Sequence, residues 1–278
     1  MRLHLLGVRG STPTPGAAFA RYGGHTSCVA VEVDDGAVPL VLDAGTGLRS
    51  LGGLLDGGAF TGTLLLGHLH WDHTHGLPFS AAVDNPDATV RVLAPTEPGH
   101  DVDDLLAQAM SPPNFPIAPG DLRGDWSWSG LVDGPLTCEG LQVLAREIPH
   151  KGGRTFGFRV SDGRTSFAYL SDHMPQAFGP GADGLGELHD AALALADGVD
   201  VLVHDAQYTA EELPTRGAFG HSAAEYAVGL GLAAGVGRVV LFHHDPGRTD
   251  DEVDAIVGRF TDAGLPVEAA AEGAVLEL

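Results

Sequence analysis

Six consecutive residues carry the strongest chemical signal in this 278-residue sequence: His68-Leu69-His70-Trp71-Asp72-His73. Imidazole and carboxylate groups are both good ligands for divalent metals such as zinc or manganese. Residues two apart in an extended segment point the same way, so His68 and His70 can bind one metal while Asp72 and His73 face a second. A solvated polar turn is the alternative, but the run follows residues 63–66, which are typical of a buried strand. The run therefore predicts a metal site.

Other ligand-type residues stand where further predicted strands or helices begin or end. They are Asp43, His150, Asp172, the pair His243-His244, and His221. Taken singly, each has an ordinary alternative: Asp43 can form a turn or cap a helix, and His221 or Ser222 can cap the helix that follows. A carboxylate at Asp172 can bridge two cations, and Asp43 can orient a ligand histidine. Because strand ends gather at one sheet edge, these residues together predict a single site.

The charge of the chain limits its partners. Fifteen basic and 37 acidic residues give a formal net charge of −22, which repels polyanions and opposes long nucleic acid as a substrate. A small anion remains possible as a substrate because a metal pair can dominate the local field. Two cysteines, Cys28 and Cys138, cannot form a disulfide framework, and neither a signal peptide nor a membrane-spanning run is evident. We therefore expect a cytoplasmic protein without a membrane partner.

The apolar pattern predicts one α/β domain over residues 1–278, with two sheets face to face and helices outside. Strands are predicted at 3–8, 28–33, 38–42, 62–67, 89–94, 141–148, 154–160, 165–170, 199–204, 238–242 and 266–277. Helices are predicted at 46–56, 75–83, 101–110, 187–196, 222–234 and 249–262, with hairpin turns at 34–36 and 162–164. Residues 95–130 are rich in proline and predict a long loop excursion over the surface.

With these motifs, the chain resembles the metallo-β-lactamase-fold hydrolases over nearly its whole length. The run at 68–73 matches their HxHxDH signature, and the other ligand-type residues follow in the expected order. Further matching segments are Gly10-Ser11-Thr12-Pro13, Tyr22-Gly23-Gly24, Thr26-Ser27-Cys28, Gly76-Leu77-Pro78-Phe79, Gly220-His221-Ser222 and Phe242-His243-His244-Asp245-Pro246. They are similar to the branch near ribonuclease Z and the cyclic phosphodiesterase of phosphonate breakdown. The resemblance implies a four-layer αββα sandwich with the metals at the sheet edge between its halves.

The resemblance also implies a role for each site residue. The first metal would be held by His68, His70 and His150, the second by Asp72, His73 and His243, with Asp172 bridging and Asp43 behind them. His221 resembles the histidine that donates a proton near the scissile phosphate. His244 competes with His243 for the last ligand position, and His243 is preferred because it directly follows a strand. The branch often has Asn in place of His25 and Thr in place of Gly67, and neither is a ligand position.

These roles imply hydrolysis of a small phosphodiester, such as a cyclic nucleotide or a cyclic sugar phosphate, by hydroxide held between two divalent ions, zinc or manganese. Asp72 would also orient or deprotonate the attacking water, and His221 would protonate the leaving group. Lys151 and Arg154 could contact phosphate or be solvated charges. Trp126 and Trp128 could wall the pocket or anchor the excursion to the core.

Three rival functions remain open. An acyl-hydrolase acting on a lactone, β-lactam or thioester would use the same metals but would not need His221. Redox chemistry on two irons is disfavoured because relatives of that kind carry a carboxylate where this chain has His70. A metal-binding regulatory protein without activity is the third. A homodimer is possible, because relatives in this branch often dimerise.

Overall fold

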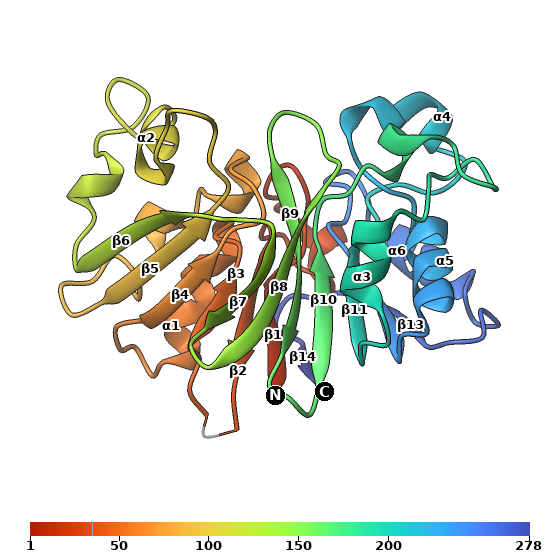
Figure 1. Ribbon diagram of the computed structural model, residues 1–278, viewed down its shortest axis with the longest axis horizontal. Helices are drawn as coiled ribbons and strands as arrows, with labels where there is room; N and C mark the ends of the chain where they lie inside the picture. Colours follow the sequence, from red (N-terminus) through yellow and green to blue (C-terminus); the bar gives the residue numbers. More distant parts are fainter. Residues whose placement is uncertain (35) are drawn as a thin grey trace.

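Two seven-stranded sheets packed face to face form the centre of the computed structural model, which describes residues 1–34 and 36–278 (Figure 1). The first sheet has the order β14 (Val275–Glu277), β1 (Arg2–Gly7), β2 (Cys28–Glu32), β3 (Leu40–Leu42), β4 (Thr61–Leu65), β5 (Thr89–Ala94) and β6 (Asp125–Gly130). The second has the order β13 (Val267–Ala269), β12 (Arg238–Phe242), β11 (Val201–Asp205), β10 (Ser166–Leu170), β9 (Thr155–Ser161), β8 (Leu141–Ile148) and β7 (Gly134–Cys138).

Short helices cover the outer faces of both sheets (Figure 1). The α-helices are α1 (Leu51–Leu54), α2 (Val102–Ala107), α3 (Asp190–Ala196), α4 (Leu213–Arg216), α5 (Ala224–Ala234) and α6 (Asp250–Gly258). Single 3₁₀ turns are η1 (Ala17–Phe19), η2 (Thr46–Ser50), η3 (Trp71–His73), η4 (Leu77–Phe79), η5 (Pro119–Asp121), η6 (Pro175–Phe178) and η7 (Gly217–Phe219). In the part of the chain described, no helix has the length and apolarity that a membrane crossing requires.

The period-2 alternation of the strands builds three apolar layers. In β2, Val29 and Val31 face the core between the sheets, whereas Cys28 and Ala30 face the outer layer under α1 and η2. A third layer lies between the second sheet and helices α3, α5 and α6. Side chains of a strand buried on both faces must be apolar at every position, which explains the continuous apolar runs in the sequence. The predicted αββα sandwich is therefore confirmed.

The excursion predicted at residues 95–130 is only partly a loop. It contains α2, and its last six residues form β6, which pairs in parallel with β5. Trp126 and Trp128 stack on each other with ring centroids 5.2 Å apart and pack against the outer layer of the first sheet. Their alternation with Asp125, Ser127 and Ser129 is the period-2 signal of an edge strand. The sequence left two roles open for these tryptophans, and the structure shows the second: they anchor the excursion to the core.

Two further predicted elements differ from the structure. The helix predicted at 75–83 is reduced to η4, since Gly76 packs against the Gly45 carbonyl and Pro78 interrupts the pattern. The strand predicted at 266–277 is two strands, β13 and β14, which belong to different sheets. Gly273, at a φ of 83°, lies in the segment between them, where the chain crosses from one sheet to the other. The hairpin turn predicted at 34–36 includes Asp35, which lies outside the described residues.

Gly45 allows the run at residues 68–73 to pack closely against the first sheet. Its N–H donates to the Ser27 carbonyl, and the neighbouring Ala44 N–H donates to the carbonyl of His73. A Cβ at Gly45 would overlap the carbonyl oxygen of Asp72 and lie 2.7 Å from that of Ser27. Neither backbone atom can move without moving the site.

Gly45→Ala is therefore expected to destabilise the fold by about 3 kcal/mol, at the upper end of the cost of overpacking. Urea unfolding measures the change. Gly53→Ala is the matched control, because a Cβ there meets nothing within 4 Å and alanine favours the helix. Equal stabilities of the two variants would contradict the close approach at Gly45.

Candidate metal centre

The predicted ligands converge because each follows a strand that ends at the same edge of the sandwich. Asp43 follows β3, the 68–73 run follows β4, His150 follows β8, Asp172 follows β10, and His243 follows β12. The β3–β4 and β11–β12 pairs are parallel, and so are β10 and β11. The carboxyl ends of parallel strands meet at one edge, so their loops share one site.

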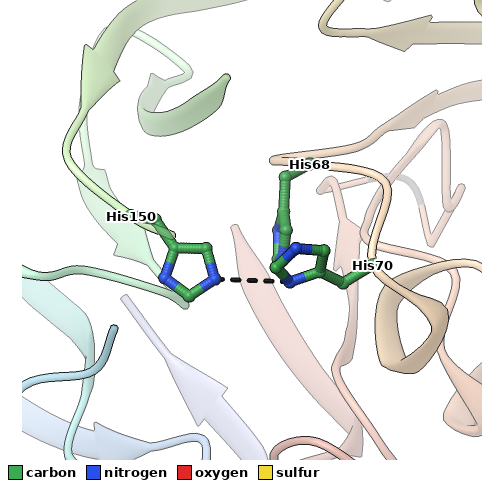
Figure 2. A group of neighbouring side chains, drawn as sticks. All are labelled: His68, His70 and His150. Atoms are coloured by element: carbon green, nitrogen blue, oxygen red, sulfur yellow. Dashed lines mark hydrogen bonds between the residues drawn. The ribbon is translucent and has the colours of Figure 1, made fainter. Parts of the chain in front are cut away.

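All seven predicted ligands fall into groups whose ligand atoms lie within 4.8 Å of one another. The groups are His68-His70-His150, His68-His73-Asp172, Asp72-His73-His243 and His150-Asp172-His221. Figure 2 shows the first of them, in which His150 Nε2 lies 3.3 Å from His70 Nδ1. Two triads with no residue in common therefore lie side by side, which is the arrangement that two neighbouring metals need.

Asp172 lies between the two triads. Its Oδ1 is 3.8 Å from His68 Nε2 and 3.7 Å from His150 Nε2. On the other side, His243 Nε2 is 3.2 Å from Oδ1 and His73 Nε2 is 3.0 Å from Oδ2. A carboxylate in this central position can offer one oxygen to each of two cations.

The second ring nitrogen of three of these histidines is anchored. His73 Nδ1 donates to Asp43 Oδ2 at 2.8 Å, His150 Nδ1 donates to the Gly220 carbonyl at 2.7 Å, and His243 Nδ1 lies 3.0 Å from Ser27 Oγ. In a neutral imidazole with Nδ1–H, the lone pair is on Nε2. The anchors therefore aim the lone pairs of His73 and His150 at the cluster.

Several buried atoms of the cluster have no hydrogen-bond partner. They are both ring nitrogens of His68, Nε2 of His73 and His243, and Oδ2 of Asp172. Buried polar atoms without a partner are costly, and native structures contain few of them. A bound cation would satisfy the acceptors that face the cluster, so the residues present fit a metal site.

Burial and neighbouring charges shift the pKa values of the cluster in both directions. Burial and the neighbouring His73 hold the pKa of His68 well below its ordinary value, which favours the neutral ligand form. Burial alone would raise the pKa of Asp172, but the imidazoles of His243 and His73 hold it well below its ordinary value. Asp72 behaves in the same way beside His73 and His243, so its pKa is also lowered. At His73 the effect has the opposite sign: burial would lower its pKa, but Asp172, Asp72 and Asp43 raise it well above its ordinary value, so a metal that binds there would displace a proton from the imidazole.

Asp43 lies behind the site, where the sequence predicted it. Its Oδ1 accepts from the Gly67 N–H, and its Oδ2 accepts from His73 Nδ1 and from the Tyr169 hydroxyl, each at 2.8 Å. Its φ of 58° is left-handed, a conformation that Asp and Asn tolerate better than most residues. The carboxylate thus fixes the ring orientation of His73.

Asp43→Asn is expected to weaken zinc binding by about 10- to 100-fold, the usual effect of losing the partner of a ligand histidine. Asparagine keeps the left-handed turn, so the loss reports the carboxylate rather than the backbone. Competition with a chromophoric chelator measures the affinity. Unchanged affinity would mean that Asp43 only shapes the turn.

His221 faces the cluster from the segment between η7 and α5, and it has a partner that the sequence did not predict. Its Nδ1 donates to Asp205 Oδ2 at 3.0 Å, and the same oxygen accepts from the backbone N–H of His173 at 3.0 Å. Burial lowers the pKa of His221, but Asp205, Asp172 and Asp72 outweigh it and raise the pKa above the ordinary value. Asp205 ends β11, so the strand-end pattern that identified Asp172 could have identified it too.

The remaining candidates point away from the cluster. His244 Nε2 lies 2.9 Å from the Ala270 carbonyl and is in none of the four groups, so His243 is the residue that faces the site. Lys151 Nζ donates to the Ala218 carbonyl at 3.0 Å. Arg154 pairs with Glu147 at 2.9 Å. Neither cation is directed at the cluster in this structure.

Two hollows open beside the cluster. The smaller, of about 430 Å³, is lined by Ser11, Leu69, His70, Trp71, Asp72, Asp172 and His221. The larger, of about 860 Å³, extends from His68 and His70 to α2. Ligand pockets commonly have volumes of 300–1,000 Å³. The Ser11 N–H donates to Asp72 Oδ2 at 2.7 Å, which fixes this carboxylate on the wall of the smaller hollow.

A family model described as a beta-lactamase superfamily domain matches residues 41–244, a span that contains all seven predicted ligands. The chain belongs to the beta-lactamase superfamily. The resemblance predicted from the histidine run of this superfamily member is therefore confirmed.

Individual relatives agree with this assignment. Ribonuclease BN of Salmonella paratyphi C is 28% identical over 220 residues, covering 65% of this chain and 69% of the relative. The metallo-beta-lactamase fold protein YhfI from Bacillus subtilis has a TM-score of 0.71 at 19% identity, with 99% of both chains covered. A diphosphatase from the PhnP family has a TM-score of 0.69 at 18% identity, covering 100% of this chain and 97% of that one. The two structural likenesses show a shared fold.

Proposed function

We propose that this superfamily hydrolase uses two divalent metals, zinc or manganese, to hydrolyse a small phosphodiester. The observation that carries the proposal is the pair of triads, His68-His70-His150 and Asp72-His73-His243, on either side of Asp172. The triads would each hold one metal, and Asp172 would bind both. When bound, two such ions supply a water that ionises near neutral pH and positive charge for phosphate oxygens.

The residues around the smaller hollow would direct the reaction. Asp72, held by the Ser11 N–H, would orient the attacking water as well as bind metal. Water adds to phosphorus while one ester oxygen leaves, giving a phosphomonoester and an alcohol. His221, held at Nδ1 by Asp205, directs its other ring nitrogen away from that carboxylate and would donate the proton that the leaving oxygen needs.

Phosphate chemistry is favoured over acyl hydrolysis by two observations. An acyl transfer on these metals does not require a histidine held by a buried carboxylate, yet the Asp205–His221 pair lies 3.7 Å from Asp172. The names of two similar proteins, a ribonuclease and a diphosphatase, also describe cleavage of phosphorus–oxygen bonds. The net charge of −22 supports a small anionic substrate rather than long RNA. We also propose that the protein is cytoplasmic.

The test is a screen of metal-loaded protein against bis-p-nitrophenyl phosphate, cyclic nucleotides, lactones and thioesters. We expect hydrolysis of the phosphodiesters, loss of activity on chelation and its return with zinc or manganese. Turnover of a lactone or thioester without turnover of any phosphodiester would replace this function with acyl hydrolysis. Full metal occupancy without any turnover would support a regulatory role.

A further inference from the structure

The larger cavity differs in chemistry from the hollow that holds His221. Its walls are mainly apolar, with side chains from η4, from α2 and from the turn after α2, such as Leu77, Leu106 and Met110. Glu97 and Arg154 are the residues with formal charge among its described lining, and Arg154 already pairs with Glu147. An uncharged group is therefore the best complement to this cavity.

Aromatic rings are exposed at the wall of the cavity. Trp71 is 65% exposed, and its ring is stacked on His75 with centroids 5.5 Å apart and planes 20° apart. Phe79 is 59% exposed and meets Phe115 edge to face at 5.7 Å. Exposed aromatic faces that converge on one cavity favour a flat ring as a stacking partner.

The two hollows adjoin each other. Leu69, His70 and Trp71 line both of them, so a ligand can span from the polar hollow into the apolar cavity. The polar hollow holds His221, the proposed proton donor, and the leaving oxygen is therefore expected there. The ester group that stays on phosphorus would then enter the larger cavity.

From this geometry we propose that the substrate carries an aromatic group on its phosphate, and that the cavity between η4 and α2 binds it. The inference rests on the proposed function, and it narrows the substrate class. A nucleoside or aryl phosphodiester fills a cavity of about 860 Å³ far better than a cyclic sugar phosphate does. Residues 95–115, which contribute the α2 wall, then determine specificity.

The test compares two phosphonates that cannot be hydrolysed, benzylphosphonate and methylphosphonate, by calorimetric titration of the zinc-loaded protein. Benzylphosphonate is expected to bind at least about tenfold more tightly, because its ring is removed from water. Ala109→Trp should abolish this preference, since exposed Ala109 lines the cavity and an indole there would fill it. Ala233→Trp is the matched control, an exposed alanine near the end of α5 outside both hollows.

Phe79→Ala is a second variant that leaves the core intact, and it should weaken benzylphosphonate binding several-fold without changing methylphosphonate binding. Equal binding of the two phosphonates, no binding of benzylphosphonate, or a preference that survives Ala109→Trp would overturn the inference. Hydrolysis of phosphodiesters without the preference overturns the cavity assignment alone. The preference without hydrolysis of any phosphodiester keeps the aromatic site and overturns the proposed reaction.

Discussion

Asp172→Asn is expected to remove both metals and to lower phosphodiesterase turnover by at least about 10³-fold, equivalent to about 4 kcal/mol of transition-state stabilisation. The carboxylate lies between the two triads, with His73 Nε2 at 3.0 Å on one side and His150 Nε2 at 3.7 Å on the other. The amide has almost the same size but carries no charge and offers one oxygen instead of two. Metal content after desalting and kcat on bis-p-nitrophenyl phosphate measure the effect.

Asp262→Asn is the matched control, because Asp262 is exposed and lies in the turn after α6. It should keep the metal content and the activity of the unmodified protein. If Asp172→Asn retained two metals per chain and near-normal turnover, the carboxylate would not bridge the triads, and the arrangement of the site proposed above would be wrong.

His221→Ala is expected to lower kcat by about 100-fold for a phosphodiester with an alkoxide leaving group, the usual contribution of a positioned acid. For bis-p-nitrophenyl phosphate the loss should be small, since p-nitrophenolate leaves without a proton at neutral pH. Asp205→Asn should give a smaller loss that also depends on the leaving group, because Asp205 positions His221 through its hydrogen bond to Nδ1. Steady-state kinetics on the two substrates measure it.

The comparison of leaving groups separates catalysis from structure. His100→Ala changes an exposed histidine outside both hollows and should leave both rates unchanged. If His221→Ala lowered both rates equally, His221 would have a structural or metal-binding role. If neither rate changed, the leaving group would not require His221, as expected of an acyl-hydrolase that happens to accept phosphodiesters.

The sequence predicted the layers and the site because strong local patterns determine both. Continuous apolar strands such as 63–66 must be buried, and polar ligands directly after them must lie at the sheet edge. Asp43 could be assigned behind the site for the same reason. Asp205 was missed although it directly follows the strand predicted at 199–204, as Asp43 directly follows the strand predicted at 38–42, so the same pattern could have identified it.

Other features depend on long-range packing, which local patterns do not determine. The division of the last predicted strand into β13 and β14 depends on which edge of each sheet is free to accept another strand. Each of the two strands has only three residues, which is too short for a clear alternating pattern. The β6 strand was not predicted because the segment before it is rich in proline. The choice between His243 and His244 depended on the backbone conformation at His243, which has a left-handed φ of 59°. The apolar cavity combines residues from several loops, and no single segment encodes it.

Metal titration tests the central proposal, a hydrolase with two metals bridged by Asp172, most directly. Protein freed of metal by chelation is titrated with zinc or manganese, while bound metal and hydrolysis of bis-p-nitrophenyl phosphate are followed together. We predict no activity without metal and a maximum at two equivalents per chain. A maximum at one equivalent, or turnover that persists in the metal-free protein, would contradict the proposal.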